Sequence, residues 1–159
     1  MSTFRFLAIL SFLLFFAGES EVEACSCFGR PQGVQTCGYY WNSDEVFIGL
    51  AEKVEIDERV GGMKVTFSVE RPIRGASEKT IEVFTSANTA SCGYPFKQGK
   101  RYFVYARKGQ DGKLSESLCG PTTPLEDAED DLEYAKEIEG GKLGSRIWGR
   151  VFDVRHVGR

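Results

Sequence analysis

Hydrophobic and polar residues alternate in short runs through the central part of the chain, as in strands with one buried face. The clearest run is KVTFSVE at 64–70, in which Val65, Phe67 and Val69 fall on one face. Turn residues such as those of RVGG and KGQDG separate it from four further runs. The five predicted strands are residues 45–56, 64–70, 80–86, 101–107 and 113–117. This pattern predicts a mainly β fold, either a small five-stranded barrel or a sandwich.

One segment, TPLEDAEDDLEYAKEIEG at 123–140, has helical periodicity instead. We expect Thr123 to cap this helix, Pro124 to occupy its first position and Glu126 to complete a capping box. Its apolar residues recur at helical spacing, which predicts a stripe packed against the strands. The stripe consists of Leu125, Ala128, Leu132, Ala135 and Ile138.

The segments at either side of this pattern are less regular. Residues 25–43 are rich in Gly, Pro and Gln without periodicity, which predicts an irregular arm held by its cysteines. We therefore expect one domain at 25–145. Residues 146–159 alternate like a strand, and form either a final strand of this domain or the first strand of a further β-sandwich module.

The first 24 residues have the features of a secretory signal peptide. Arg5 precedes the apolar run FLAILSFLLFFA, which is shorter than a membrane-spanning helix. Val22 and Ala24 lie three and one residues before Cys25, as at a signal-peptidase site. We predict cleavage before Cys25 and a secreted, extracellular protein. The alternative is a periplasmic or surface lipoprotein acylated on Cys25. The acidic segment ESEVE, which separates the apolar run from Cys25, argues against this alternative.

Composition narrows the possible partners. Removal of residues 1–24 leaves 135 residues, enough for one domain with its own core, and changes the net charge from −3 to about −1. The sequence has no basic patch with interleaved aromatic residues, so a nucleic-acid partner is not expected. It has no second apolar run long enough to span a membrane.

The cysteines indicate disulfides rather than a metal site, because all of them follow the predicted cleavage point. They are Cys25, Cys27, Cys37, Cys92 and Cys119. His156 is the only histidine, so an ordinary Cys/His zinc site is not expected. Cys25 and Cys27 are too close in sequence to pair with each other, and each should therefore reach a distant partner. Because the number of cysteines is odd, one of them is left without a disulfide partner within the chain.

The sequence offers little support for an enzyme. It contains no Gly-rich phosphate loop, no nucleophile elbow and no paired-histidine motif. The only formal Cys–His pair is Cys37 with His156, and these lie in the irregular arm and the C-terminal tail. We therefore expect a protein that is not an enzyme and has no cofactor of its own.

The segment CSC at the expected mature N-terminus is followed by PQGVQTC, VFIG, SCGYPFKQGKRYFVYA, SLCGPTTPL and an acidic helix. Over about residues 25–139 this order resembles the tissue inhibitors of metalloproteinases. The similarity is to their inhibitory N-terminal domain, a netrin-like OB-fold barrel. It implies the disulfides Cys25–Cys92 and Cys27–Cys119, and it leaves Cys37 free or paired between two molecules of a dimer.

The resemblance also implies a mechanism. In that family the α-amino nitrogen and carbonyl oxygen of the first mature cysteine chelate the catalytic zinc of a protease. Cys25 would take this role, Ser26 would point into the primary specificity pocket, and residues 90–92 would form an adjoining contact ridge. The implied protease-binding residues are Cys25, Ser26, Cys27, Ala90, Ser91 and Cys92.

The function expected from the sequence is therefore inhibition of a zinc metalloproteinase, with the zinc supplied by the protease. The alternative is a non-inhibitory netrin-like binding module at the cell surface or in the periplasm, whose N-terminus is only structural. The two functions differ in one requirement, because chelation needs a free α-amine on Cys25.

Overall fold

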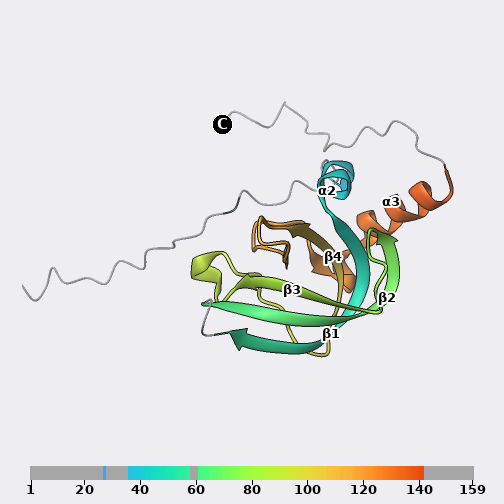
Figure 1. Ribbon diagram of the computed structural model, residues 1–159. Coiled ribbons are helices and arrows are strands. Elements are labelled where there is room, and N and C mark those ends of the chain that lie inside the picture. The colour runs from blue at the N-terminus through green and yellow to red at the C-terminus, as the bar shows by residue number, and fades with distance from the viewer. Residues whose placement is uncertain (1–26, 28–35, 58–60, 142–159) are drawn as a thin grey trace, which may run out of the picture.

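The computed structural model describes residues 27, 36–57 and 61–141 (Figure 1). The predicted signal peptide, Cys25, Ser26 and residues 146–159 lie outside these ranges. In chain order the elements are α2 (Thr36–Asn42), β1 (Glu45–Asp57), β2 (Gly62–Arg74), β3 (Thr80–Ser86), the 3₁₀ turn η1 (Thr89–Ser91), β4 (Arg101–Lys108), β5 (Leu114–Ser115), β6 (Thr123–Pro124), the 3₁₀ turn η2 (Leu125–Asp127) and α3 (Glu129–Glu139). None of the helices within the described ranges has the length and hydropathy to cross a membrane.

β1 closes the sheet into a ring, because it pairs antiparallel with β2 along one edge and with β4 along the other. β3 pairs with β2, and the short β5 pairs with both β3 and β4 to complete the circuit. β6 pairs with Tyr102 and Phe103 of β4. Figure 1 shows the long curve of β1 from α2 across the molecule. The prediction of a mainly β domain with a C-terminal helix is confirmed, and all five predicted strands are present.

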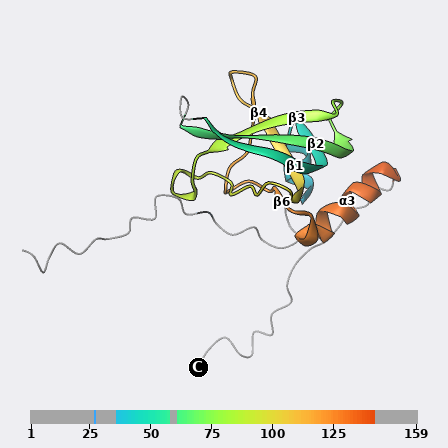
Figure 2. The ribbon, with the colours of Figure 1, turned by 90° about the horizontal axis from the view of Figure 1, so that it is seen from below.

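The ring separates two hydrophobic clusters. The cluster inside the ring is built from every strand of the circuit and includes Phe47, Val65, Phe67, Val83, Val104 and Leu114. A second cluster lies on the outer side of β1 and β4, under the two helices, and includes Tyr40, Val46, Ile48, Phe103, Tyr105, Ala128 and Ala135. The helices α2 and α3 lie at this side of the ring (Figures 1 and 2). β4 is therefore buried on both faces, with successive residues alternating between the clusters.

The C-terminal helix is shorter than the sequence predicts. Thr123 and Pro124 pair with β4 as a strand, and a 3₁₀ turn follows before α3 begins at Glu129. Ala128 occupies the N-cap position without a side-chain hydrogen bond, so the predicted Thr123–Glu126 capping box is wrong. Backbone pairing with β4 satisfies groups that a helix end would leave without partners. The predicted apolar stripe is confirmed, since its members pack in the outer cluster.

The sequence analysis missed α2, because TCGYYWN contains Gly and aromatic residues with low helix propensity. Its stability comes from tertiary contacts. Tyr40 is buried in the outer cluster, and the Arg74 guanidinium stacks over the Tyr40 and Trp41 rings at 5.5 and 5.3 Å. Arg74 Nη1 also donates to the carbonyl oxygens of Tyr40 and Ser43, which cap the helix C-terminus. The irregular arm predicted at 25–43 is thus helical at 36–42.

β2 continues four residues beyond the predicted strand. It runs through Pro72, a residue type that usually interrupts a strand. Pro72 pairs with Phe47 of β1 next to a register shift, in the part of β2 that extends past its pairing with β3. The missing N–H of a proline disrupts little at such an edge or bulge.

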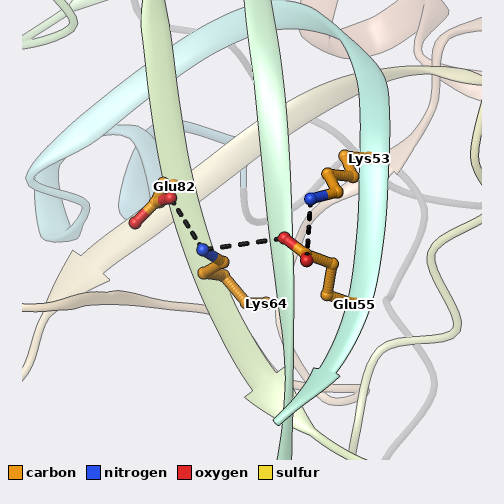
Figure 3. Close-up of polar contacts among 4 residues, drawn as sticks. All are labelled: Lys53, Glu55, Lys64 and Glu82. Atoms are coloured by element: carbon orange, nitrogen blue, oxygen red, sulfur yellow. Dashed lines mark hydrogen bonds and ion pairs between the residues drawn. The ribbon is translucent and has the colours of Figure 1, made fainter.

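Polar side chains on three neighbouring strands form a charge ladder (Figure 3). Lys64 Nζ lies 3.0 Å from Glu82 Oε1 and 3.7 Å from Glu55 Oε2, and Lys53 Nζ lies 2.8 Å from Glu55 Oε1. The hydrogen bond from Lys53, and then the charges of Lys53 and Lys64, hold the pKa of Glu55 below its usual value. Because these groups are largely solvated, the ladder adds little to the stability of the sheet.

We predict that Tyr105→Phe lowers the free energy of unfolding by about 1–3 kcal/mol, because it removes a donor from a buried carboxyl group. The Tyr105 hydroxyl donates to Asp131 Oδ1 at 2.7 Å and joins β4 to α3, and Asp131 is only 2% exposed. Urea denaturation followed by circular dichroism measures the change.

The control is Glu82→Gln, which removes one ion pair of the exposed ladder and should cost less than about 1 kcal/mol. A loss for Tyr105→Phe no larger than that of the control would contradict the stabilising role of the buried bond.

Candidate functional site

The structure places four of the six predicted protease-binding residues. Ala90 and Ser91 are exposed in η1, Cys92 follows them half-buried, and Cys27 is half-buried. Cys25 and Ser26 lie outside the described residues. The candidate site is therefore the contact ridge, residues 90–92, together with the cysteines that anchor the N-terminal segment.

The contact ridge is held by its own local hydrogen bonds. The Asn88 side chain caps η1, because its Oδ1 accepts from Ser91 N at 2.9 Å. Cys92 N donates to Thr89 O, and Gly93 N donates to Asn88 O. Cys92 has φ of 64°, a left-handed conformation that is uncommon for a residue with a Cβ. The turn thus presents two small side chains at the surface while reversing the chain into Cys92.

Gly93 allows this turn to pack against the end of β3. A Cβ at Gly93 would lie 2.1 Å from the carbonyl oxygen of Ser86 and 2.8 Å from that of Asn88. Tyr94 N then donates to the Thr85 hydroxyl oxygen at 2.8 Å. The contact ridge is consequently held against the end of β3 by the two residues that follow Cys92.

The two predicted anchor cysteines of the ring are held next to each other. Leu118 N donates to Cys92 O at 2.8 Å, which fixes the residue preceding Cys119 against Cys92. Cys119 forms a disulfide with Cys27, with a Cα–Cα distance of 5.2 Å, as the family pairing implies. Cys92 is also disulfide-bonded, and its predicted partner Cys25 lies outside the described residues. Cys27 is therefore bonded to the residue that follows Leu118, and Leu118 is itself hydrogen-bonded to Cys92 of the contact ridge.

A buried acidic residue supports the chain that carries Cys119. Glu116 is 8% exposed, and its Oε1 atom has no hydrogen-bond partner. Burial raises the pKa of this carboxyl group to about 8, against the opposing effects of the Thr122 backbone N–H and the charge of Arg107. The carboxyl group therefore holds its proton at neutral pH.

Cys37 is a free, exposed thiol on α2, which packs against α3 and β4 rather than on the contact ridge. His156, with which it formed the only formal catalytic pair, lies outside the described residues. Among the described residues, no group of three or more His, Cys, Asp or Glu side chains is placed to hold a metal ion.

Sequence reasoning missed three residues that shape this site: Asn88, Gly93 and Glu116. Asn88 could have been found, because an Asn three residues before a polar position in a turn is a common cap. Glu116 could have been found from the alternation of KLSES, which places it on the same face as Leu114. Nothing local to the sequence signals the close approach at Gly93.

Comparison with models of known protein families gives no match, and a search of curated proteins finds no relative of this chain.

We predict that Gly93→Ala lowers the thermal stability of the protein and disturbs Cys92, because the added methyl group would overlap the Ser86 carbonyl oxygen. The expected loss is about 1–3 kcal/mol, as for other overpacked positions. Differential scanning calorimetry measures it.

Gly38→Ala is the matched control. Position 38 lies in α2 with no atom within 4 Å of an added Cβ, so the substitution should be neutral or slightly stabilising. Equal effects at the two positions would show that Gly93 is not required for close packing.

Proposed function

We propose that this protein is a secreted inhibitor of zinc metalloproteinases that acts through the α-amino nitrogen and carbonyl oxygen of Cys25. The observation that carries the proposal is the joint anchoring of the N-terminal segment and the contact ridge. The Cys27–Cys119 disulfide and the bond from Leu118 N to Cys92 O attach both to one rigid part of the ring. The closed ring of five strands further supports the proposal that this is a netrin-like OB-fold barrel.

Rigid anchoring matters because chelation by a chain terminus is entropically costly. Each side chain or segment that must be ordered on binding reduces affinity, so a terminus that is already fixed binds more tightly. A catalytic zinc offers one exchangeable coordination position besides its three protein ligands. The amine and the carbonyl oxygen of a single residue would together replace the bound water as two zinc ligands.

The protonation state of the terminus also suits this role. An α-amino group has a pKa of roughly 7.7–8.0, far below that of lysine, so a useful fraction is unprotonated near neutral pH. Ala90 and Ser91 are small and exposed, so they leave room for a protease surface against the contact ridge. Ser26 would then enter the primary specificity pocket of the protease.

We predict that protein starting at Cys25 inhibits at least one member of a panel of zinc metalloproteinases, and that one additional N-terminal alanine weakens this inhibition by at least about 100-fold. The extension converts the chelating amine into an amide, which is a poor zinc ligand at neutral pH. Inhibition constants from hydrolysis of fluorogenic peptides provide the measurement, with intact mass used to verify each N-terminus.

The extended protein should keep its melting temperature, since the alanine adds no contact to the ring. Equal inhibition by the two forms would exclude a chelating N-terminus. Failure of the Cys25 form against the whole panel would favour the second candidate function.

That second candidate is a non-inhibitory netrin-like binding module, and exposed hydrophobic residues favour it. Trp41 is 56% exposed on α2, and Ile56 is 69% exposed near the end of β1. Tryptophan is enriched in protein–protein interfaces relative to the rest of the protein surface. In this case a partner protein would bind to α2 rather than to the N-terminus. Blocking the Cys25 amine would then leave partner binding unchanged.

A further inference from the structure

The chain that carries Cys119 turns around the carboxyl group of Glu116. We name residues 116–122 the cystine turn. It starts where Glu116 N donates to Phe84 O at 2.9 Å on β3, and a bond from Gly120 N to Ser117 O at 2.9 Å closes it internally. Cys119 is exposed within this turn and bonded to Cys27.

The Glu116 carboxyl group connects both ends of the cystine turn. It accepts hydrogen bonds from the backbone N–H groups of Ser117 and Thr122, which lie on either side of Cys119. Thr122 is itself attached to β4, because its hydroxyl oxygen accepts from Tyr105 N at 3.0 Å. One side chain thus spans the turn from β5 to the segment that leads into β6.

The carboxyl group is covered by the turn that it supports. A Cβ at Gly120 would lie 1.5 Å from Glu116 Oε1, so Gly120 packs directly over this oxygen and a larger residue there would displace the carboxyl group. Oε1 is buried and has no hydrogen-bond partner. Movement of Gly120 would uncover this atom to water and would open the cystine turn.

Few charges compensate for a negative charge at this position. The Arg107 guanidinium on β4 favours the ionised carboxylate, and burial outweighs it. Asp111 and Lys113 of the β4–β5 turn carry opposite charges and line, with Glu116, a hollow of about 320 Å³ beside β3. Their own ion pair, with a separation of 4.0 Å, reduces the net field at Glu116.

We infer that the neutral carboxyl group of Glu116 positions the cystine turn and, through the disulfide of Cys119, also Cys27, and that raising the pH makes the turn easier to open. The ionised group gains hydration when Gly120 moves away and admits water. The effect on the turn follows from the structure alone, whereas its consequence for inhibition rests on the proposed function.

The direction of the pH dependence follows from linkage. The pKa of Glu116 is about 8 in the closed turn and near its ordinary value of 4.5 when the side chain is hydrated. The closed turn therefore binds the proton more tightly than the open turn does. The stability that the protonated carboxyl group contributes to the closed turn is complete below about pH 4.5. It declines as the pH rises towards 8 and is constant above that value.

The test compares the wild-type protein with Glu116→Gln, a neutral isostere that can still accept the two backbone hydrogen bonds. The rate at which a water-soluble phosphine reduces Cys27–Cys119 is measured from pH 5 to pH 9 by alkylation and peptide mass spectrometry. The ratio of the wild-type rate to the Glu116→Gln rate cancels the pH dependence of the reductant. We expect this ratio to rise at least tenfold between pH 5 and pH 8 and to level off above.

Glu52→Gln, at an exposed position of β1, is the matched control and should give a constant ratio. A constant ratio for Glu116→Gln would overturn the inference. If Glu116→Gln fails to fold, a carboxyl-carbon NMR titration of the wild-type protein replaces it. A midpoint near 8, accompanied by shifts of the Ser117 and Thr122 amides, supports the inference, and a midpoint near 4.5 overturns it.

Inhibition constants measured between pH 6 and pH 8.5 separate the two proposals. The wild-type protein and Glu116→Gln have the same Cys25 amine, so the titration of this amine cancels when their inhibition constants are compared. The ratio of the wild-type inhibition constant to that of Glu116→Gln should rise with pH. If no protease is inhibited while the reduction ratio rises, the proposed function fails and the role of Glu116 in the turn stands. If the protein inhibits but neither ratio changes, the proposed function stands and the inference fails.

Discussion

The pairing of β1 with two different strands is the constraint on which the rest of the structure depends. To reach both β2 and β4, β1 must curve strongly, and its ladder with β2 shifts register at three points along its length. Such irregularities increase local twist and bend the strand. Gly49 lies at one of them, where a Cβ would be 3.0 Å from the Phe47 ring and 3.1 Å from Ser68 O.

Closure of the ring determines what every other element must do. A closed sheet has an inner face that its own side chains fill and an outer face that must meet water or another layer. The outer faces of β1 and β4 carry Val46, Ile48 and Phe103, so α2 and α3 are needed to cover them. The same closure brings the end of β3 next to β5, which is how Cys92 and Leu118 come within hydrogen-bonding distance.

Much of this fold could be predicted from the sequence, because strand alternation depends on local pattern. The bounds of β3 matched the prediction, and the apolar stripe of α3 packs as expected. The helix α2 could not be predicted, since it depends on Arg74, more than thirty residues away, for its C-terminal cap. The start of α3 was misplaced because Thr123 and Pro124 are excellent capping residues whose backbone instead pairs with β4. At the candidate site, the sequence identified the anchor cysteines through a resemblance, whereas the contacts that fix them are made between strands far apart in the chain.

The position of the Cys27–Cys119 disulfide gives the domain a particular mechanical character. The two cysteines are 92 residues apart, and the five strands of the ring all lie between them. Tension applied to the chain before Cys27 and after Cys119 would pass through the covalent sulfur bridge and bypass the hydrogen bonds of the ring. In the described part of the chain, β6, η2 and α3 follow Cys119, and they would bear the load and detach first. A pull that peels away the C-terminal helix would therefore leave the ring, the contact ridge and the attached Cys27 in place.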